Sequence, residues 1–273
     1  AGPCNVAIEV GLHGPTMANS NSCASGAVAI GEAARLIADG RADVMLAGGV
    51  EAPLAPLTFG SFALVKAMST ATDDPCHASR PFDARRDGFV MGEGAAMLVL
   101  ESLAHAEARD ATIYAEIGGY GTTNDGYDML APLPDGGQAA RAIRVALDEA
   151  GIEADQVDYV NAHASATPIG DRAEARAICS ALGEQARHVP VSGTKGLYGH
   201  PLGASGAIET ALSALAIAHG HLPGTANLVE PDADNPLNLI GPAGLRRHVK
   251  VVLNNAFGFG GINAALILTA VQR

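Results

Sequence analysis

Hydrophobic residues recur along the chain in two patterns, one typical of helices and one typical of strands. The two patterns take turns, so the sequence predicts helices that alternate with strands. Apolar residues on one face, closed by glycine or charged residues, predict helices over 4–12, 24–39, 136–151, 171–182 and 203–219. Short apolar runs bounded by turn residues predict strands over 14–21, 42–48, 94–101, 113–120, 157–162, 189–192, 248–255 and 263–269. Helices that alternate with strands are typical of a layered α/β protein with crossover helices.

The order of these elements repeats, which suggests an internal duplication with a boundary near residue 110. Each half has a strand ending in a loop of small residues, SNSCASG in one and NAHASAT in the other, followed by a helix. Each half also ends in an antiparallel strand pair. We therefore expect two halves, 1–110 and 111–273, of which the first lacks an opening strand–helix–strand unit.

Composition narrows the class of protein. Hydrophobic residues make up 48% and charged residues 17% of the 273 residues, with 33 Gly and 15 Pro spread along the chain, which excludes a disordered or fibrous protein. No apolar run reaches the roughly 18–20 residues that a membrane-spanning helix needs, so no membrane span is predicted. The net charge is −12 and no Lys/Arg run is present, which argues against nucleic-acid binding.

The four cysteines do not form a framework. Cys4, Cys23, Cys76 and Cys179 have no CxxC or Cys/His ligand spacing, so neither a disulfide scaffold nor a zinc site is predicted. Free thiols of this kind fit a reducing compartment. Cys4, Cys76 and Cys179 are expected to be small buried apolar residues, whereas Cys23 stands in a context of its own.

Cys23 lies between a predicted strand and the first turn of the helix 24–39, among small residues. Free backbone N–H groups and the helix dipole favour an anion at such a place, and they are expected to lower the pKa of the thiol. Small neighbours also permit a sharp turn that exposes the sulfur. The residues alone leave two interpretations open, a nucleophile and a buried structural cysteine.

Three further groups follow predicted strands. His163 comes directly after the strand 157–162, where open α/β sheets place ligand-facing groups. Ser165 and Thr167, two and four residues on, either bind a polar ligand or cap the following helix. Lys195 and His200 flank a glycine-rich turn into the helix 203–219, and the absence of GxxxxGK[ST] excludes a nucleotide-binding P-loop.

The last two strands are joined by a turn rich in glycine and phenylalanine. Residues 254–263 read NNAFGFGGIN and contain Phe257 and Phe259, two of only six Phe in the chain. A simple hairpin turn is one interpretation. Two aromatic side chains in so aromatic-poor a chain favour a functional lid.

Taken together, these motifs resemble those of the β-ketoacyl-acyl carrier protein synthases of type I/II, members of the thiolase-like superfamily. The likeness runs from residue 1 to 273 and includes segments without reactive groups, such as 42–49 (ADVMLAGG) and 87–94 (DGFVMGEG). The order and spacing of the cysteine, histidine, lysine and histidine motifs also fit. The resemblance implies a duplicated α-β-α-β-α layered fold of the thiolase type whose N-terminal half is incomplete.

The resemblance assigns a role to each reactive group. Cys23 would take an acyl chain from a carrier as a thioester. His163 and His200 would hold the malonyl thioester carbonyl and stabilise the enolate that forms as CO2 leaves. Lys195 would organise His163 electrostatically, with Glu209 as its ionic neighbour.

Further positions follow from the same likeness. The backbone N–H groups of Cys23 and Phe259 would form an oxyanion hole, and Phe259 with Phe257 would form the gate. Ser165 and Thr167 would contact the pantetheine arm. Phe62 would line the acyl pocket, and Lys66 would meet the acidic carrier.

The resemblance also implies partners and setting. It implies acyl- and malonyl-loaded acyl carrier protein as partner, a homodimer, a cytoplasmic location, and neither a cofactor nor a metal. The chain departs from the family at Leu130-Ala131, where a small polar pair is common, at Ile262, and at Asn21-Ser22. The family carries a further stretch ahead of the residue that is Ala1 here, so the chain is expected to lack the first third of the enzyme.

The predicted activity is that of a 3-oxoacyl-acyl carrier protein synthase, an acyltransferase that elongates fatty acids by decarboxylative condensation. Two alternatives stay open: a polyketide ketosynthase, and a non-catalytic fragment or partner subunit. Cys23 argues against a partner subunit, because non-catalytic partners lack the cysteine, whereas the expected missing first third keeps a non-catalytic fragment open. A thiolase is disfavoured because no cysteine follows Cys179, and an initiating synthase because two histidines, not His and Asn, accompany Cys23.

Overall fold

A six-stranded mixed sheet forms the centre of the computed structural model, which describes residues 2–271. Its strands lie in the order β3-β10-β9-β4-β5-β7. β3, β10 and β9 pair antiparallel, whereas β9, β4, β5 and β7 run parallel. The strands are β3 (Glu116–Asn124), β4 (Tyr159–Asn161), β5 (Pro190–Ser192), β7 (Asn238–Leu239), β9 (Val251–Gly258) and β10 (Ile262–Thr269).

The two central strands are buried on both faces, so successive side chains enter different cores. In β9, Leu253 packs into one core and Val252 into the other; in β10, Ile267 and Leu266 divide in the same way. All four side chains are 0% exposed. Burial of an aliphatic side chain of this size contributes roughly 1.5–3 kcal/mol, so this hairpin stabilises both cores at once.

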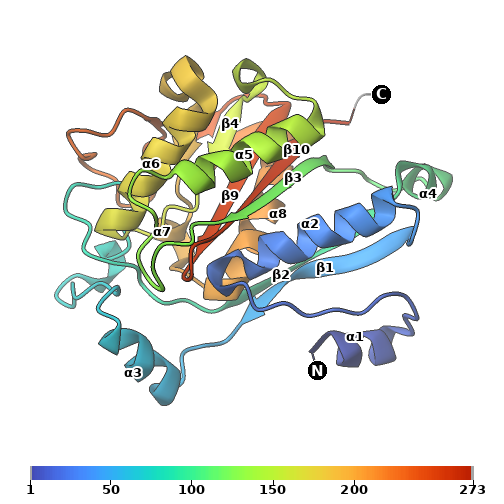
Figure 1. The fold of residues 1–273 in the computed structure, drawn as a ribbon, viewed down its shortest axis with the longest axis horizontal. Coiled ribbons are helices and arrows are strands. Elements are labelled where there is room, and N and C mark those ends of the chain that lie inside the picture. Colours follow the sequence, from blue (N-terminus) through green and yellow to red (C-terminus); the bar gives the residue numbers. More distant parts are fainter. Residues whose placement is uncertain (1, 272–273) are drawn as a thin grey trace.

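Helices cover both faces of the central sheet (Figure 1). α5 (Gly137–Ala150) and α6 (Pro168–Leu182) pack on one face through a stripe of alanine and branched aliphatic residues. α2 (Ser25–Ala38) and α8 (Ser205–His219) pack on the other. Because Gly26 and Gly206 have no side chains, the starts of α2 and α8 come very close together: a Cβ on either would lie 2.7 Å from a backbone nitrogen of the other helix.

A second, smaller sheet lies on the far side of α2 and α8. β1 (Val44–Glu51) and β2 (Gly94–Glu101) pair antiparallel, and their inward residues join the core that α2 and α8 share. The outward residues Val50, Met97 and Val99 are 72%, 55% and 57% exposed. The described residues therefore stack as helix, sheet, helix and sheet, with an uncovered apolar face at the end of the stack.

Shorter elements complete the chain. α1 (Gly2–Val10) and α3 (Pro56–Leu64) contain no buried residue. The others are α4 (Leu103–Ala108), α7 (Lys195–Tyr198), β6 (His221–Leu222), β8 (Leu245–Arg246) and five 3-10 turns, Ser22–Ala24, Pro75–His77, Ala154–Gln156, Gly183–Arg187 and Leu202–Ala204. No helix among residues 2–271 is both long and apolar enough to cross a bilayer.

The periodicity predicted most of these elements but failed at one strand. Residues 14–21 were expected to form a strand, yet they are irregular and almost wholly exposed. A strand needs hydrogen bonds to a neighbour, and within the described chain this segment pairs with no other strand. The expected burial of Cys4 and Cys76 is also wrong, since both thiols are exposed, and Cys179 is only half-buried.

Candidate functional site

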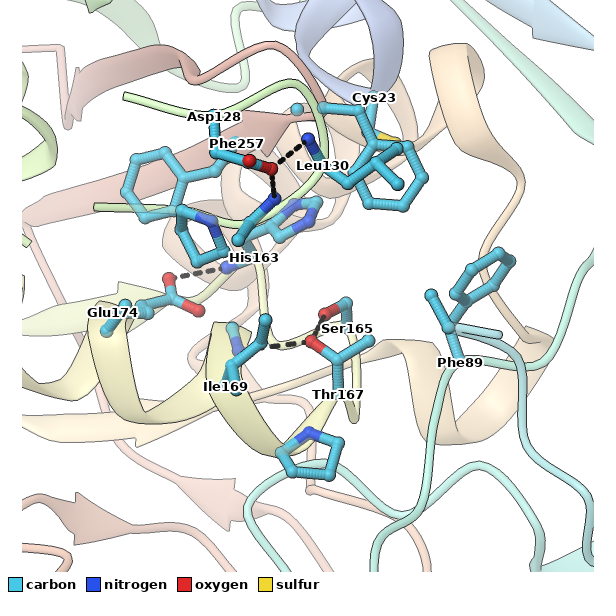
Figure 2. Close-up of a pocket in the computed structure, with 18 of the residues that line it drawn as sticks. Cys23, Phe89, Asp128, Leu130, His163, Ser165, Thr167, Ile169, Glu174 and Phe257 are labelled. Carbon is cyan, nitrogen blue, oxygen red and sulfur yellow. Dashed lines mark hydrogen bonds between the residues drawn. The ribbon is translucent and has the colours of Figure 1, made fainter. Parts of the chain in front are cut away.

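A cavity of about 400 Å³ lies where the start of α2, the turn before α8, the loop after β4 and the β9–β10 turn meet. Its walls bring together four segments that are far apart in the sequence, represented by Cys23, His163, His200 and the pair Phe257 and Phe259. In the view of Figure 2 the Cys23 sulfur lies above the level of the His163 ring, and Ser165 and Thr167 lie below that ring.

Cys23 occupies the 3-10 turn Ser22–Ala24 that leads into α2. Ser22 has a φ of 50°, an uncommon value for a residue with a side chain, and this places Cys23 at a sharp bend. The Ser25 hydroxyl stabilises the bend: it donates to the Ser22 carbonyl at 2.7 Å and accepts the Asn21 N–H at 2.9 Å. The turn thus aims the thiol into the cavity while leaving it only 7% exposed.

The expected low pKa of the Cys23 thiol is wrong. Burial raises the pKa of Cys23 to about 11, while Lys195 and a hydrogen bond from the Phe259 backbone act in the lowering direction. The loss of water around the sulfur outweighs the partial charges of one short turn. In this structure the thiol is therefore neutral at physiological pH.

The β9–β10 turn presses its backbone against this thiol. The Phe259 backbone N–H lies toward the Cys23 sulfur and acts to lower the pKa of the thiol. A Cβ on Gly258 would lie 3.0 Å from the Cys23 nitrogen, so only glycine lets the two segments approach so closely. The backbone N–H groups of Cys23 and Phe259 thus come from two segments that are in contact.

His163 is placed by its backbone. It follows β4, and the Glu174 carboxylate on α6 accepts the His163 N–H at 2.7 Å (Figure 2). The same carboxylate accepts the Ala164 N–H at 2.7 Å. Ala164 has a φ of 40°, and the two hydrogen bonds offset the strain of that turn. The Nδ1 atom of His163 is buried and has no hydrogen-bond partner among the described residues.

His200 lies on the other wall, in the turn between α7 and α8. Its backbone N–H donates to the Val90 carbonyl at 2.7 Å, and its Nδ1 lies 2.8 Å from the Ser205 hydroxyl oxygen. The rings of His163 and His200 meet edge to face with centroids 5.3 Å apart. Phe89 packs against His200 from the far side at 5.4 Å, also edge to face.

Both imidazoles are neutral. Burial, reinforced by the positive charge of Lys195, lowers the pKa of His163 and the pKa of His200 well below the ordinary value of 6.5. Each ring therefore has one N–H to donate and one nitrogen to accept a hydrogen bond.

Lys195 lies behind His163 and does not line the cavity. Its ammonium group donates to the His163 carbonyl at 2.5 Å and forms an ion pair with the Glu209 carboxylate. Both side chains are 0% exposed. Burial raises the pKa of Glu209 to about 7 and Lys195 opposes that shift, so the lysine stabilises the carboxylate while holding the loop that carries His163.

Ser165 and Thr167 line the same cavity, and Thr167 also begins α6. The Thr167 hydroxyl accepts the Gly170 N–H at 3.2 Å and lies 2.9 Å from the Ser165 hydroxyl. The two roles that the sequence left open, helix cap and cavity lining, are thus combined in Thr167. Asp171, on the first turn of α6, accepts the Ala166 N–H at 3.0 Å.

The remaining predicted site residues differ in whether they reach the cavity. Lys66 and Phe257 line the cavity, and the Phe257 ring is 5.9 Å from the His163 ring. Phe62 does not line it: its ring packs on Phe89 at 6.1 Å, in a small apolar cluster that also contains Cys23. Leu130, at the position where the family has a small polar pair, lines the cavity as well.

Several residues that shape the site were not predicted. Glu174 and Asp171 hold the backbone of the loop 163–167, Phe89 packs on His200, and Ser205 bonds to its ring. One signal was available for the carboxylates, because Asp171 and Glu174 are three residues apart on the alanine-rich buried face of α6. In residues 2–271 no three His, Cys, Asp or Glu side chains are grouped to hold a metal ion.

The chain is similar to known proteins over nearly its whole length. The family profile described as "Beta-ketoacyl synthase, N-terminal domain" matches residues 1–106, and "Beta-ketoacyl synthase, C-terminal domain" matches 114–229. The chain is 47% identical over 266 residues to the 3-oxoacyl-[acyl-carrier-protein] synthase 2 of Synechocystis sp., covering 97% of this chain and 64% of that protein. It is 46% identical over 268 residues to a putative polyketide beta-ketoacyl synthase 1 of Streptomyces halstedii, covering 98% of this chain and 64% of that protein.

The fold is also similar to that of a solved ketosynthase structure. A type II polyketide ketosynthase, solved in complex with its acyl-carrier protein and bound to a hexaketide, matches with a TM-score of 0.97 at 39% identity. That match covers 99% of this chain and 66% of the other. The chain thus spans about 64% of the length of the curated relatives it matches.

Proposed function

The chain belongs to the β-ketoacyl synthase family, and we propose that it is a 3-oxoacyl-acyl carrier protein synthase of fatty acid elongation. The reaction would join an acyl group held on Cys23 to a malonyl unit on an acyl carrier protein, with release of CO2. One observation carries the proposal: the cysteine and two neutral histidines face one cavity, with the Phe259 N–H against the sulfur.

The first half-reaction moves the acyl group to Cys23. The sulfur attacks the thioester carbonyl of the loaded carrier, the carrier sulfur leaves, and the proton of Cys23 passes to it. Because burial keeps the resting thiol neutral, the proton leaves Cys23 as its sulfur bonds to the carbonyl and is transferred to the departing carrier sulfur. The N–H groups of Cys23 and Phe259 would stabilise the oxyanion of the tetrahedral intermediate.

The second half-reaction releases CO2 from the malonyl group. The bond to the carboxylate breaks, its electron pair forms an enolate on the thioester, and the enolate carbon then attacks the acyl carbonyl on Cys23. The carbon–sulfur bond to Cys23 then breaks, which releases the 3-oxoacyl product on the carrier and leaves a Cys23 thiolate that regains a proton from water. The developing charge on the thioester oxygen needs hydrogen-bond donors already in place. Two neutral imidazoles with ring centroids 5.3 Å apart supply donors from two sides of the cavity.

Lys195 and Glu209 support this step without entering the cavity. The ion pair holds the His163 carbonyl and places a positive charge behind both rings. That charge disfavours protonation of either imidazole, so both remain in the neutral form that decarboxylation requires.

The substrate arm would run along the polar side of the cavity. Ser165 and Thr167 supply hydroxyls there, and Lys66 supplies a positive charge where an acidic carrier would dock. At the opposite wall Leu130 gives an apolar contact where relatives carry a small polar residue. The gate would be formed by Phe259 with Phe257, and Phe62, packed on Phe89, would border the acyl chain.

A polyketide ketosynthase is the second candidate function. It is supported by the relative from Streptomyces halstedii and by the fit to a ketosynthase bound to a hexaketide. Both candidates use the same chemistry and differ in whether the 3-oxo group is left in place for a further round. Incubation without any reductase therefore separates them, because only a polyketide ketosynthase would elongate its own unreduced 3-oxoacyl product to greater length.

We propose further that the protein is a homodimer located in the cytoplasm. The exposed apolar side chains of Val50, Met97 and Val99 support a covering partner, since apolar patches of this kind mark interaction sites. The free thiols of all four cysteines support a reducing location. Light scattering tests the first proposal, and fractionation of the native cell tests the second.

The activity test uses the 273-residue chain with acyl- and malonyl-loaded carrier. We expect a 3-oxoacyl product and CO2 in equal amounts, with the product lost in Cys23→Ala and both retained in the control Cys179→Ala, whose thiol lies outside the cavity. Absence of product and CO2 from the unmodified chain would show that it is not a condensing enzyme. Product formation by Cys23→Ala would remove the cysteine from the mechanism.

A further inference from the structure

The starts of α2 and α8 are two copies of one arrangement. Residues 24–27 and 204–207 both read ASGA. Each follows a 3-10 turn whose first residue has positive φ, 50° at Ser22 and 39° at Leu202. The duplication makes Ser25 and Ser205 equivalent positions at the first residues of the two helices.

The two equivalent serines have different partners. Ser25 stabilises its own turn, donating to the Ser22 carbonyl at 2.7 Å. Ser205 instead lies 2.8 Å from Nδ1 of His200 and makes no other side-chain hydrogen bond within residues 2–271. Ser205 is 0% exposed and His200 is 3% exposed, so water does not compete for either group.

Because the Ser205 hydroxyl has no other partner among the described side chains, the direction of its hydrogen bond to His200 can be deduced. If Nδ1 carried the ring proton, the Ser205 oxygen would accept it and the buried hydroxyl proton would have no acceptor, which is costly. If the Ser205 hydroxyl donates, Nδ1 accepts, and both buried groups are satisfied. The neutral ring then has its single proton on Nε2.

We propose that Ser205 is a positioning residue for His200: its hydroxyl donates to Nδ1 and keeps the ring proton on Nε2. His200 lines the cavity, so Nε2 is the nitrogen left to donate to a bound group. A hydrogen bond that keeps one ring nitrogen unprotonated leaves the proton on the other nitrogen, and this fixes the tautomer of the ring. For the reaction, this inference rests on the proposed function, because the donor would face the malonyl thioester oxygen.

His163 provides the contrast within the same cavity. Its Nδ1 is buried without a partner, so no side chain fixes its tautomer in the way that Ser205 fixes that of His200. The backbone of His163 is held by Glu174 and Lys195 instead. We therefore expect substitution at 205 to alter the tautomer of His200 and to leave that of His163 unchanged.

Nitrogen NMR of the ¹⁵N-histidine-labelled protein tests this directly, with His200 assigned by its loss in His200→Gln. In the wild type we expect Nε2 to give the protonated type of signal and Nδ1 the unprotonated type. Ser205→Ala should give a mixture of the two tautomers, and Ser205→Thr, which keeps the hydroxyl, should restore the wild-type pattern. The control Ser213→Ala removes another buried hydroxyl of α8, one that bonds to Glu209 and Asn254, and should leave the His200 signals unchanged.

Two results would overturn the inference: a wild-type His200 protonated on Nδ1, or a folded Ser205→Ala with unchanged signals. The wild-type spectrum alone decides the first, so the test does not depend on how the variant folds. It also needs no turnover, so it stands even if the proposed function fails.

Kinetics add a second readout. Ser205→Ala should lower malonyl decarboxylation about three- to tenfold, the loss expected for one neutral hydrogen bond, while acylation of Cys23 stays within about twofold. An equal fall in both half-reactions would mean a general structural effect and would contradict a specific role at His200.

Discussion

The two halves of the chain contribute to one cavity, but they support their contributions differently. His163, Lys195 and His200 come from loops of a six-stranded sheet that helices cover on both faces, and all three are buried. Cys23 comes from a helix above a two-stranded sheet whose outer face exposes Val50 and Met97.

Even so, Cys23 is as well enclosed as the histidines. Gly258 packs on its backbone, and α2 and α8 touch at Gly26 and Gly206. The position of Cys23 is thus set chiefly by contact with the C-terminal half and less by the sheet of its own half.

The largest effect should come from breaking the buried ion pair of the C-terminal half. Lys195→Met leaves the Glu209 carboxylate without a partner at 0% exposure, and loss of one member of a buried pair costs about 3–5 kcal/mol. Urea unfolding measures the cost, and adding Glu209→Gln should recover part of it. The matched control is Arg109→Met, which breaks the pair with Glu101 at the surface of the N-terminal half; there the unfolding midpoint should not move.

The next effect tests whether the helix contact positions Cys23. Gly206→Ala places a Cβ 2.7 Å from the Ala27 nitrogen, and overpacking of this kind costs about 1–3 kcal/mol. We expect a lower melting temperature together with faster alkylation of Cys23, because the two helix starts must separate.

Gly60→Ala in α3 is the control. A Cβ there meets nothing within 4 Å, and replacing a helical glycine gains about 0.5–1 kcal/mol. If Gly206→Ala leaves both melting and alkylation as they are in the wild type, the contact does not position the nucleophile.

The pH dependence of reactivity should differ between Cys23 in the N-terminal half and the histidines in the C-terminal half. Because burial raises the pKa of Cys23 to about 11, its alkylation rate should rise about tenfold per pH unit between about pH 7 and 10, without a plateau. A plateau near neutrality would indicate a thiolate and contradict the neutral resting state.

The pKa values of the two histidines shift in the opposite direction from that of Cys23. Burial lowers the pKa of His163 and of His200 well below 6.5, so the active neutral rings persist as the pH falls through that value. We expect the decarboxylation rate to be level from about pH 8 to 6.5, and to fall only at lower pH as the rings gain protons. A titration centred near 6.5 would show that burial does not control these rings.

The smallest effect concerns the uncovered face of the N-terminal sheet. Val99→Thr changes a side chain that is 57% exposed and should alter the free energy of unfolding by no more than about 0.5 kcal/mol. Its neighbour Leu98 points into the shared core. Leu98→Ala should therefore lower the free energy of unfolding by about 1–3 kcal/mol. These costs are those of a single chain; in the proposed homodimer the partner covers the outer face, the two costs become similar, and light scattering shows which mass each measurement reports.

Much of the fold could be predicted from the sequence. The layered α/β fold is confirmed, and β2, β9, β10 and the long helices lie close to where the periodicity placed them. The strands β6, β7 and β8 were missed because two residues carry no periodic signal. α3 was missed because its nine residues are apolar on all sides and bury none.

The site was predictable in its reactive groups and not in their surroundings. Cys23, His163 and His200 lie together at the cavity, and Lys195 lies behind them. The pKa of Cys23 was not predictable, because it depends on how completely the β9–β10 turn covers the sulfur. The roles of Glu174 and Ser205 depend on side-chain contacts across turns, which spacing along the chain does not reveal.

One measurement tests the central claim, that Cys23 and the C-terminal histidines form a single working site, most directly. The chain is incubated with acyl-loaded carrier and mapped by peptide mass spectrometry before and after malonyl carrier is added. We predict one acyl group, on Cys23 and not on the exposed Cys4 or Cys76, which malonyl carrier then removes as a 3-oxoacyl product. An acyl group on another cysteine, or one on Cys23 that malonyl carrier leaves in place, would contradict it.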